Sequence, residues 1–203
     1  MDPHLLEVAR AARGFMPDDE GLALYEAGVA ARGLGPLLEV GTYCGKSAVY
    51  LGAAARATGT VVFTVDHHRG SEENQAGWEW HDAELVDDAT GRMDTLPFFR
   101  RTIEAAQLED TVVAVVGHSL PVAAVWQTSL GLCFIDGGHA LDAAITDYDG
   151  WARHVVGGGL LVFPDVFEDP ADGGHAPFEG WKRAVADGFT PVSTTGSLRV
   201  LRA

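Results

Sequence analysis

The stretch that decides the fold reads Leu37-Leu-Glu-Val-Gly-Thr-Tyr-Cys-Gly-Lys-Ser-Ala-Val49. Its first four residues are apolar except for Glu39 and are typical of a buried strand, and a segment with helical spacing begins at Lys46. Gly41 and Gly45 lie between the two, where glycine lets the backbone approach a neighbour closely and the start of the helix offers free N–H groups. A strand, a glycine turn and a helix in this order predict the first unit of an α/β domain.

The rest of the chain repeats this alternation of strands and helices. Because the apolar runs are nearly continuous, we expect strands that are covered on both faces, and the βαβα order predicts parallel pairing with right-handed crossovers. The expected fold class is α/β: a Rossmann-like, doubly wound, mostly parallel sheet in a single domain over residues 1–203. The expected strands are Pro36–Val40, Thr60–Asp66, Thr111–Gly117, Leu130–Asp136 and Gly158–Asp165.

Helices are expected between nearly all of these strands, and two of them form an N-terminal segment over residues 1–34. Two short runs at the end of the chain, Phe189–Ser193 and Ser197–Leu201, predict a terminal antiparallel strand pair at the sheet edge. The expected helices are Leu5–Arg13, Asp18–Arg32, Lys46–Arg56, Leu96–Ala106, Ala140–His154 and Pro177–Ala186.

Composition narrows the class of partner. The 203 residues include 47% hydrophobic residues, enough for one core, and 29 acidic against 14 basic residues give a net charge of −15. This charge argues against nucleic-acid or anionic-membrane partners and favours a neutral or cationic small molecule. Because no apolar run is long enough to span a membrane and the N-terminus lacks a signal-peptide layout, we expect a cytoplasmic protein. Cys44 and Cys133 are expected to be buried thiols rather than a disulfide or zinc ligands.

Polar residues gather where the expected strands end, and ligands of open α/β sheets collect at this edge. The second strand ends at Asp66, the third at His118 and Ser119, and the fourth at Asp136-Gly-Gly-His139. A carboxylate such as Asp66 can accept hydrogen bonds from the two hydroxyls of a ribose. Together with the glycine turn it implies a nucleoside-containing cofactor, the alternative being a glycine turn and a strand-end carboxylate that hold no ligand.

A long acidic insertion over residues 70–97 interrupts this compact plan. Connections of this length are usually lids, binding loops or disordered segments. Because a purely solvated loop has no use for two tryptophans, we expect a partly helical lid over the substrate, with surface disorder as the alternative. Trp78, Trp80 and His81 are its candidate substrate contacts, and the two indoles suit stacking on a pyranose face.

The segment Glu39–Val49 resembles the first motif of catechol O-methyltransferase and related metal-dependent methyltransferases in its tyrosine, cysteine, second glycine and serine. The resemblance implies S-adenosylmethionine as cofactor, held at its methionine end by Gly41, Tyr43 and Ser47, at its ribose by Asp66 and at its adenine by His118 and Ser119. His67 is expected to stack on the adenine or to lie in solvent. The complete set expected at the cofactor is Glu39, Gly41, Tyr43, Gly45, Ser47, Asp66, His67, His118, Ser119 and Asp136.

The segment Phe134–Asp142, with the glycine-rich run that ends at Asp165, resembles macrolide sugar O-methyltransferases of the macrocin and mycinamicin type. The resemblance implies that Asp136 binds Mg²⁺, that His139 is the catalytic base, and that Asp165 is a second metal ligand. Pro164 and Val166 depart from the family pattern, which has a further ligand beside this aspartate. The alternatives are that the two aspartates only satisfy backbone N–H groups and that His139 only precedes a helix.

Three functions follow from these features. The first is a Mg²⁺-assisted O-methyltransferase that acts on a hydroxyl of a sugar or glycoside, because catechol enzymes use a lysine base and no lysine follows Asp136 before Lys182. The second is a methyltransferase of phenolic or catechol-like small molecules. The third is a non-catalytic module that binds a nucleotide cofactor. In each case the partner is a small molecule, and for the first function it is a saccharide. If the protein forms a homodimer, we expect the N-terminal helices to make the interface.

Overall fold

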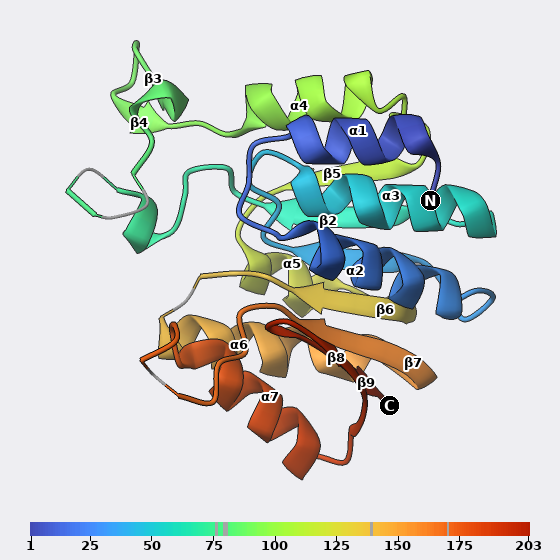
Figure 1. Ribbon diagram of the computed structural model, residues 1–203. Coiled ribbons are helices and arrows are strands. Elements are labelled where there is room, and N and C mark those ends of the chain that lie inside the picture. The colour runs from blue at the N-terminus through green and yellow to red at the C-terminus, as the bar shows by residue number, and fades with distance from the viewer. Residues whose placement is uncertain (76, 79–80, 139, 170) are drawn as a thin grey trace.

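A seven-stranded sheet forms the centre of the protein (Figure 1). The computed structural model describes residues 1–75, 77–78, 81–138, 140–169 and 171–203. The strand order is β5-β2-β1-β6-β7-β9-β8; the first five strands run parallel, and β9 is antiparallel to both of its neighbours. The Rossmann-like sheet with a terminal antiparallel pair is therefore confirmed. The bounds are β1 Leu37–Val40, β2 Val62–Asp66, β5 Val112–Val116, β6 Leu130–Ile135, β7 Val155–Phe163, β8 Thr190–Thr195 and β9 Leu198–Arg202.

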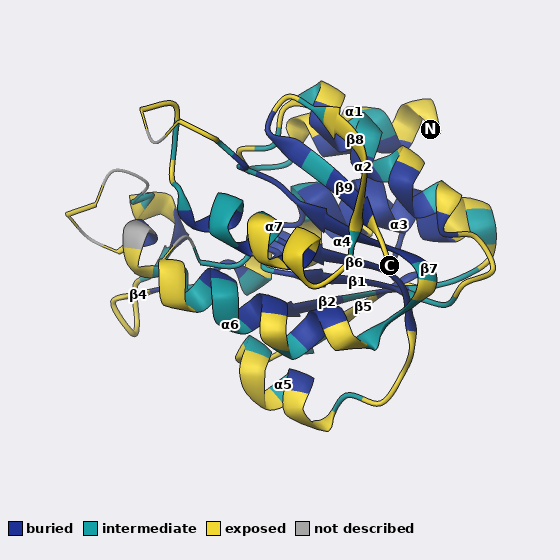
Figure 2. Ribbon diagram, turned by 90° about the horizontal axis from the view of Figure 1, so that it is seen from below, coloured by how far each residue is buried: buried dark blue, intermediate teal, exposed yellow. Residues whose placement is uncertain are grey.

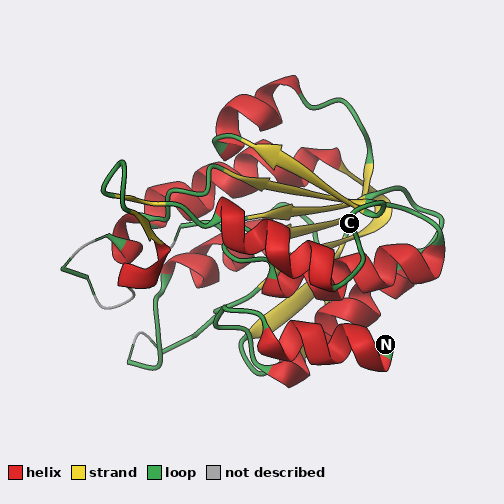
Figure 3. Cartoon of the chain, turned by 90° about the horizontal axis from the view of Figure 1, so that it is seen from above, coloured by secondary structure: helices red, strands yellow, loops and turns green. Residues whose placement is uncertain are grey.

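Helices cover both faces of the sheet (Figures 1 and 3). The first face carries α1 Pro3–Ala11, α2 Asp18–Ala30, α3 Lys46–Thr58 and α4 Leu96–Ala105, and the second carries α5 Ser119–Val125, α6 Leu141–Trp151 and α7 Ala176–Ala186. Within the described residues, no helix has both the length and the apolar character that a bilayer crossing requires.

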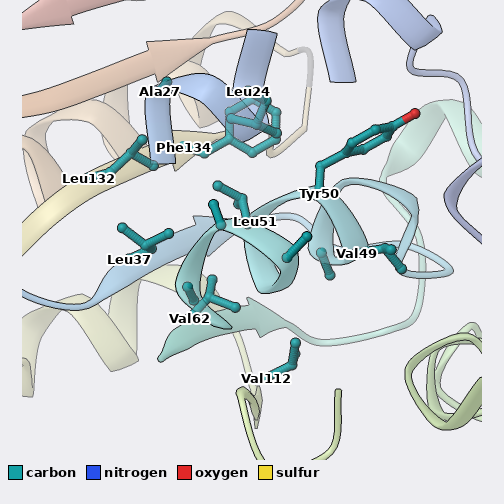
Figure 4. Close-up of a cluster of buried hydrophobic side chains, with 14 of the residues drawn as sticks. Leu24, Ala27, Leu37, Val49, Tyr50, Leu51, Val62, Val112, Leu132 and Phe134 are labelled. Carbon is teal, nitrogen blue, oxygen red and sulfur yellow. The ribbon is translucent and has the colours of Figure 1, made fainter. Parts of the chain in front are cut away.

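The hydrophobic core divides into one cluster for each face of the sheet. Figure 4 shows the larger cluster, in which Leu37 of β1 and Phe134 of β6 pack with Leu24 of α2 and Leu51 of α3. Each fully buried leucine contributes about 1.5–3 kcal/mol to folding. Figure 2 shows that the central strands are the most deeply buried part of the chain, which agrees with the continuous apolar runs in the sequence.

Three elements differ from the sequence predictions. Helix α5 lies between β5 and β6, where no helix was expected, because its seven residues include a proline and two valines and carry a weak helical signal. Strand β7 begins at Val155 rather than Gly158, since three consecutive glycines have no side-chain pattern to read. The insertion, which was expected to be partly helical, contains two short 3₁₀ helices, Glu72–Asn74 and Ala83–Leu85. It also contains a hairpin of β3 Val86–Asp87 with β4 Arg92–Met93, which was not expected.

The two edges of the sheet have different chemistry. At one edge β8 presents mainly threonine and serine to solvent, whereas at the other β5 reads Val-Val-Ala-Val-Val and leaves Val113 39% and Val116 57% exposed. Two apolar side chains of the adjacent helix α5, Leu120 and Val125, are exposed as well. Strand β5 is thus an edge without charged residues of its own.

Candidate functional site

The glycine turn that follows β1 is held by the carboxylate that ends β2. The Oδ2 atom of Asp66 accepts hydrogen bonds from the backbone N–H groups of Thr42 at 2.8 Å and Tyr43 at 2.9 Å. Its Oδ1 atom accepts one from the N–H of His68 at 2.7 Å. The turn needs this support, because Gly41 and Tyr43 both adopt positive φ angles, of 82° and 51°. Asp66 therefore shapes the loop at which the sequence predicts a cofactor.

The same turn lies directly against the start of the second motif. The backbone N–H of Asp136 donates to the carbonyl of Val40 at 2.8 Å. A Cβ atom placed on Gly41 would come within 1.9 Å of the carbonyl oxygen of Asp136, so only glycine allows this approach. The glycine turn predicted to bind the cofactor therefore lies against Asp136, the first residue of the motif predicted to bind the metal. The two segments meet because β1 and β6, which they follow, are neighbours in the sheet.

Beneath the turn lies a buried carboxyl group. Glu39 of β1 has no solvent exposure, and neither of its oxygens has a hydrogen-bond partner of good geometry in the part of the chain that is described. Burial raises the pKa of Glu39 from 4.5 to about 8, although the nearby hydroxyls of Ser47 and Thr42 act in the opposite direction. A buried acid whose hydrogen-bonding capacity is unused suits a cationic group of a ligand.

Replacing Glu39 with glutamine is expected to flatten the pH dependence of stability. Because folding raises the pKa of this carboxyl, its favourable contribution is fully present below pH 4.5 and is lost as the pH rises toward 8. One such proton changes the free energy of unfolding by up to ~1.4 kcal/mol per pH unit across this window. Urea unfolding at pH 5, 6.5 and 8 measures how the free energy of unfolding changes with pH. The exposed control Glu7→Gln should change as the wild type does. An equal change in Glu39→Gln would refute the expected effect of the buried carboxyl.

The ends of β2 and β5 bring two histidines together. The rings of His67 and His118 lie with their centroids 4.5 Å apart, and burial lowers the pKa of His67. His118 immediately precedes α5, and Ser119 is the first residue of that helix. The Oγ atom of Ser119 accepts a hydrogen bond from the indole Nε1 of Trp151 at 2.7 Å, so this hydroxyl is engaged with α6. The two rings are tilted by 37° to each other, and each offers an aromatic face to a planar base.

Behind Asp136, a second buried carboxylate lies close to the backbone of the motif. Asp147 of α6 is 7% exposed, and burial raises its pKa while the hydroxyl of Ser119 lowers it. A Cβ atom on Gly137 would lie 2.3 Å from the Oδ2 atom of Asp147. A side chain at position 137 would therefore displace the carboxylate of Asp147.

Asp165 follows the end of β7 in an unusual backbone conformation. Its φ angle is +53°, and a non-glycine residue in this region costs about 1–3 kcal/mol. Because Phe134 pairs with Val162 in parallel register, Asp136 and Asp165 leave neighbouring strands at the same end of the sheet. Across the described ranges no group of three or more His, Cys, Asp and Glu side chains forms a metal site. His139, the predicted base, lies outside the described residues.

Next to Asp136 is a small recess between the strand ends and α7. Its apolar walls come mainly from Ile135, Phe163, Pro164 and Pro177. A larger surface hollow lies at the opposite end of the sheet, between the start of α1 and the end of α3, and contains none of the predicted site residues. The predicted site residues therefore gather at the carboxyl ends of the strands rather than in this second hollow.

The insertion and the connection between α1 and α2 lie at this same end (Figure 1). Trp78 is 54% exposed, and the ring Nδ1 of His81 lies 3.0 Å from the carbonyl oxygen of Asn74. Trp80 lies outside the described residues. Arg13 forms ion pairs with Asp82 at 2.6 Å and with Glu84 at 2.5 Å, which tie the two segments together.

Sequence reasoning missed the contribution of the α1–α2 connection. Phe15 is 64% exposed, and its ring lies 5.6 Å from that of Tyr43 in the glycine turn. An aromatic residue after Gly14, between two expected helices, was the only local signal. The N-terminal segment therefore supplies an aromatic edge to the candidate site.

Comparison with known proteins agrees with this geometry. The sequence profile of a family described as a methyltransferase domain matches residues 38–166, which span the chain from β1 to the residue after Asp165. The chain belongs to this methyltransferase family. The match runs from the glycine turn through Asp66 and Asp136 to the end of β7, so the methyltransferase domain contains the whole set of strand ends described above.

Solved structures share the fold of the methyltransferase at low sequence identity. An O-methyltransferase from Bacillus cereus in complex with SAH is 16% identical, with a TM-score of 0.64, and the match covers 100% of this chain and 92% of that one. TomG from Streptomyces achromogenes, an O-methyltransferase of tomaymycin synthesis in complex with SAM, is 14% identical with a TM-score of 0.66 and coverage of 100% and 91%. A TDP-rhamnose 3'-O-methyltransferase of calicheamicin biosynthesis is 14% identical with a TM-score of 0.61 and coverage of 89% and 76%.

Proposed function

We propose that this methyltransferase is an S-adenosylmethionine-dependent O-methyltransferase that methylates a hydroxyl of a sugar or glycoside. The observation that carries the proposal is the contact between Gly41 and Asp136, which puts the cofactor turn against the first residue of the acceptor motif. A methyl group is transferred in line between two bound molecules, so the two subsites must adjoin.

The residues around the glycine turn fit the parts of S-adenosylmethionine. Glu39 offers the ammonium of the methionine a buried carboxyl with unused acceptors, beside Ser47. A carboxylate has about four lone-pair sites, so Asp66 can accept ribose hydroxyls in addition to its three backbone bonds. His67 and His118 provide the aromatic surface for adenine. When bound, the cofactor supplies an electrophilic methyl group on a sulfonium.

The reaction needs a base, because an aliphatic hydroxyl is a poor nucleophile until its proton is removed. His139 takes that proton in our proposal, since imidazole titrates near neutral pH and the residue follows Asp136 by three positions. Asp136 and Asp165 would hold Mg²⁺ together with water, which accords with the one or two protein carboxylates that this ion commonly takes. The ion supplies Lewis-acid polarisation of the hydroxyl.

Three features favour a sugar acceptor. The first is the histidine of the Asp136-Gly-Gly-His139 motif, which is the base expected of sugar-modifying enzymes. The second is that one structure of the same fold is a TDP-rhamnose 3'-O-methyltransferase. The third is the half-exposed indole of Trp78, in an insertion that Arg13 ties to the α1–α2 connection. We propose that this insertion is a lid that places aromatic side chains over the acceptor.

Methyl transfer from labelled S-adenosylmethionine tests the proposal. The assay compares monosaccharides, nucleotide sugars, glycosides and simple phenols, each with Mg²⁺ and with a chelator. We expect labelled methyl ethers of the sugar-containing substrates only, with faster turnover in Mg²⁺. Activity confined to vicinal phenolic diols and abolished by the chelator would instead support the catechol-like alternative, which the likeness of the glycine turn favours.

The third function, a non-catalytic cofactor-binding module, is tested by titration. Calorimetry with S-adenosylhomocysteine and with oxidised and reduced nicotinamide dinucleotides is expected to give saturable binding of the first alone. Selective binding of a nicotinamide dinucleotide would contradict the proposed donor. Binding of S-adenosylhomocysteine without methyl transfer to any class of acceptor would favour the module over the enzyme.

A further inference from the structure

The backbone of Asp165 is held in its left-handed conformation from outside its own strand. An L-residue keeps a positive φ angle, here +53°, only where the surroundings fix it. Its backbone N–H donates to the Oγ atom of Ser197 at 3.1 Å, and the N–H of Val166 donates to the carbonyl oxygen of Ser197 at 3.1 Å. One residue of the β8–β9 turn thus binds two successive N–H groups around the carboxylate.

Ser197 is in turn held by a buried glutamate from the N-terminal segment. The Oε1 atom of Glu20 accepts hydrogen bonds from the Ser197 N–H at 2.6 Å and from its Oγ at 2.9 Å, and Oε2 lies 3.2 Å from the same Oγ. The hydroxyl therefore donates to Glu20 and accepts from Asp165. A Cβ atom on Gly196 would lie 2.3 Å from Glu20 Oε1, so the turn leaves room for this carboxylate only with glycine.

The terminal hairpin is also held in the sheet by its own strand pairing. Strand β9 pairs with β7 from Arg199 to Arg202 and with β8 from Leu198 to Arg202. Burying the carboxylate of Glu20, which is 5% exposed, costs desolvation that its hydrogen bonds and its place in the first turn of α2 offset. Both carboxylate oxygens of Glu20 contact Ser197, and Ser197 in turn binds the backbone N–H of Asp165, so the buried glutamate acts on Asp165 through Ser197.

We infer that Glu20 and Ser197 are positioning residues that aim the carboxylate of Asp165 at the acceptor side of the site. The inference rests on the proposed function, in which Asp165 would help Asp136 to hold the Mg²⁺ that polarises the acceptor hydroxyl. Residues that orient a ligand through hydrogen bonds typically change activity or metal affinity by about 10–100-fold when removed. The N-terminal helix α2 and the C-terminal hairpin thereby become part of the active site without touching substrate.

Three variants and two controls test the inference by kinetics. In Glu20→Ala and Ser197→Ala we expect kcat to fall by about 10–100-fold, while the affinity for S-adenosylhomocysteine stays within about twofold of the wild type. Glu20→Gln is expected to recover most of the activity, because its amide oxygen can accept the same N–H and O–H. Exposed residues of the same elements provide matched controls, Glu26→Ala on α2 for Glu20 and Ser193→Ala on β8 for Ser197, and both should behave as the wild type.

A double-mutant comparison and an activity-independent readout separate positioning from folding. In an Asp165→Asn background, Ser197→Ala should cost little further activity, because the group that it positions is already altered. Hydrogen exchange of the Asp165 amide, followed by NMR without substrate, should accelerate in folded Ser197→Ala, whether or not Glu20→Ala folds, and should stay near the wild-type rate in Glu20→Gln, which keeps the hydrogen bonds to Ser197.

The outcomes are distinct. Unchanged amide exchange, or unchanged kcat in folded Ser197→Ala, would overturn the positioning role, as would a loss of kcat that is fully additive with Asp165→Asn. A wild-type protein that binds S-adenosylhomocysteine but methylates no hydroxyl would instead defeat the proposed function, and the exchange measurement would still decide whether Ser197 and Glu20 fix the backbone of Asp165.

Discussion

Replacing Asp66 with alanine is expected to raise the Kd for S-adenosylhomocysteine by at least ~100-fold, a loss of about 2.7 kcal/mol. The side chain accepts hydrogen bonds from the N–H groups of Thr42, Tyr43 and His68, and in our proposal it also binds the ribose. Alanine removes both roles, so the free energy of unfolding should fall as well, by about 2–3 kcal/mol. Calorimetric titration and urea unfolding measure the two effects.

Asp66→Asn separates the two roles. Its amide oxygen can keep the two bonds that Oδ2 now accepts from Thr42 and Tyr43, and only the bond to His68 is lost. We therefore expect the variant to remain folded while its affinity for S-adenosylhomocysteine drops at least tenfold. Asp110→Ala, an exposed aspartate at the other end of the sheet, is the control. Wild-type affinity in Asp66→Asn would exclude a direct role of this carboxylate in cofactor binding.

Replacing His139 with alanine is expected to lower kcat by about 10²–10⁴-fold, the usual range for loss of a general base. Because the base acts on the acceptor, the Kd for S-adenosylhomocysteine should stay within about twofold. Single-turnover methyl transfer measures the chemical step directly, and the loss should shrink as the pH rises and more of the hydroxyl ionises without help.

His4 offers the matched control for this variant, since it lies at the start of α1, beside Ala105 at the other end of the molecule. His4→Ala should retain wild-type turnover. Partial recovery of His139→Ala by added imidazole would strengthen the assignment of a proton acceptor. Unimpaired turnover in folded His139→Ala would remove the residue from the mechanism and leave the metal-centred, catechol-like reaction as the better account.

The sheet and one half of the candidate site could be predicted from the sequence because they depend on short-range patterns. A strand buried on both faces, such as β6, is a continuous apolar run, and the residue at which it ends is visible as the first polar side chain, here Asp136. Parallel strands of one sheet end on the same side, so Asp66, Asp136 and Asp165 could be brought together from their positions alone.

What could not be predicted depends on contacts between distant parts of the chain. Glu20 and Ser197 are 177 positions apart, and neither belongs to a motif. The left-handed conformation of Asp165 has no signature at a non-glycine position, and Phe15 reaches Tyr43 only because α1 and α2 are packed beside α3. Helix α5 was missed because tertiary packing on Trp126 and Trp151 compensates for its low helical propensity.

The exposed edge strand β5 has a consequence for handling the protein. Its sequence Val112-Val-Ala-Val-Val116 reads the same in both directions about Ala114, so two copies paired antiparallel would place a valine opposite every valine. The net charge of −15 opposes that approach at neutral pH. Toward the isoelectric point of about 4.7 this repulsion disappears, and colloidal stability then depends on an edge that has no charge of its own.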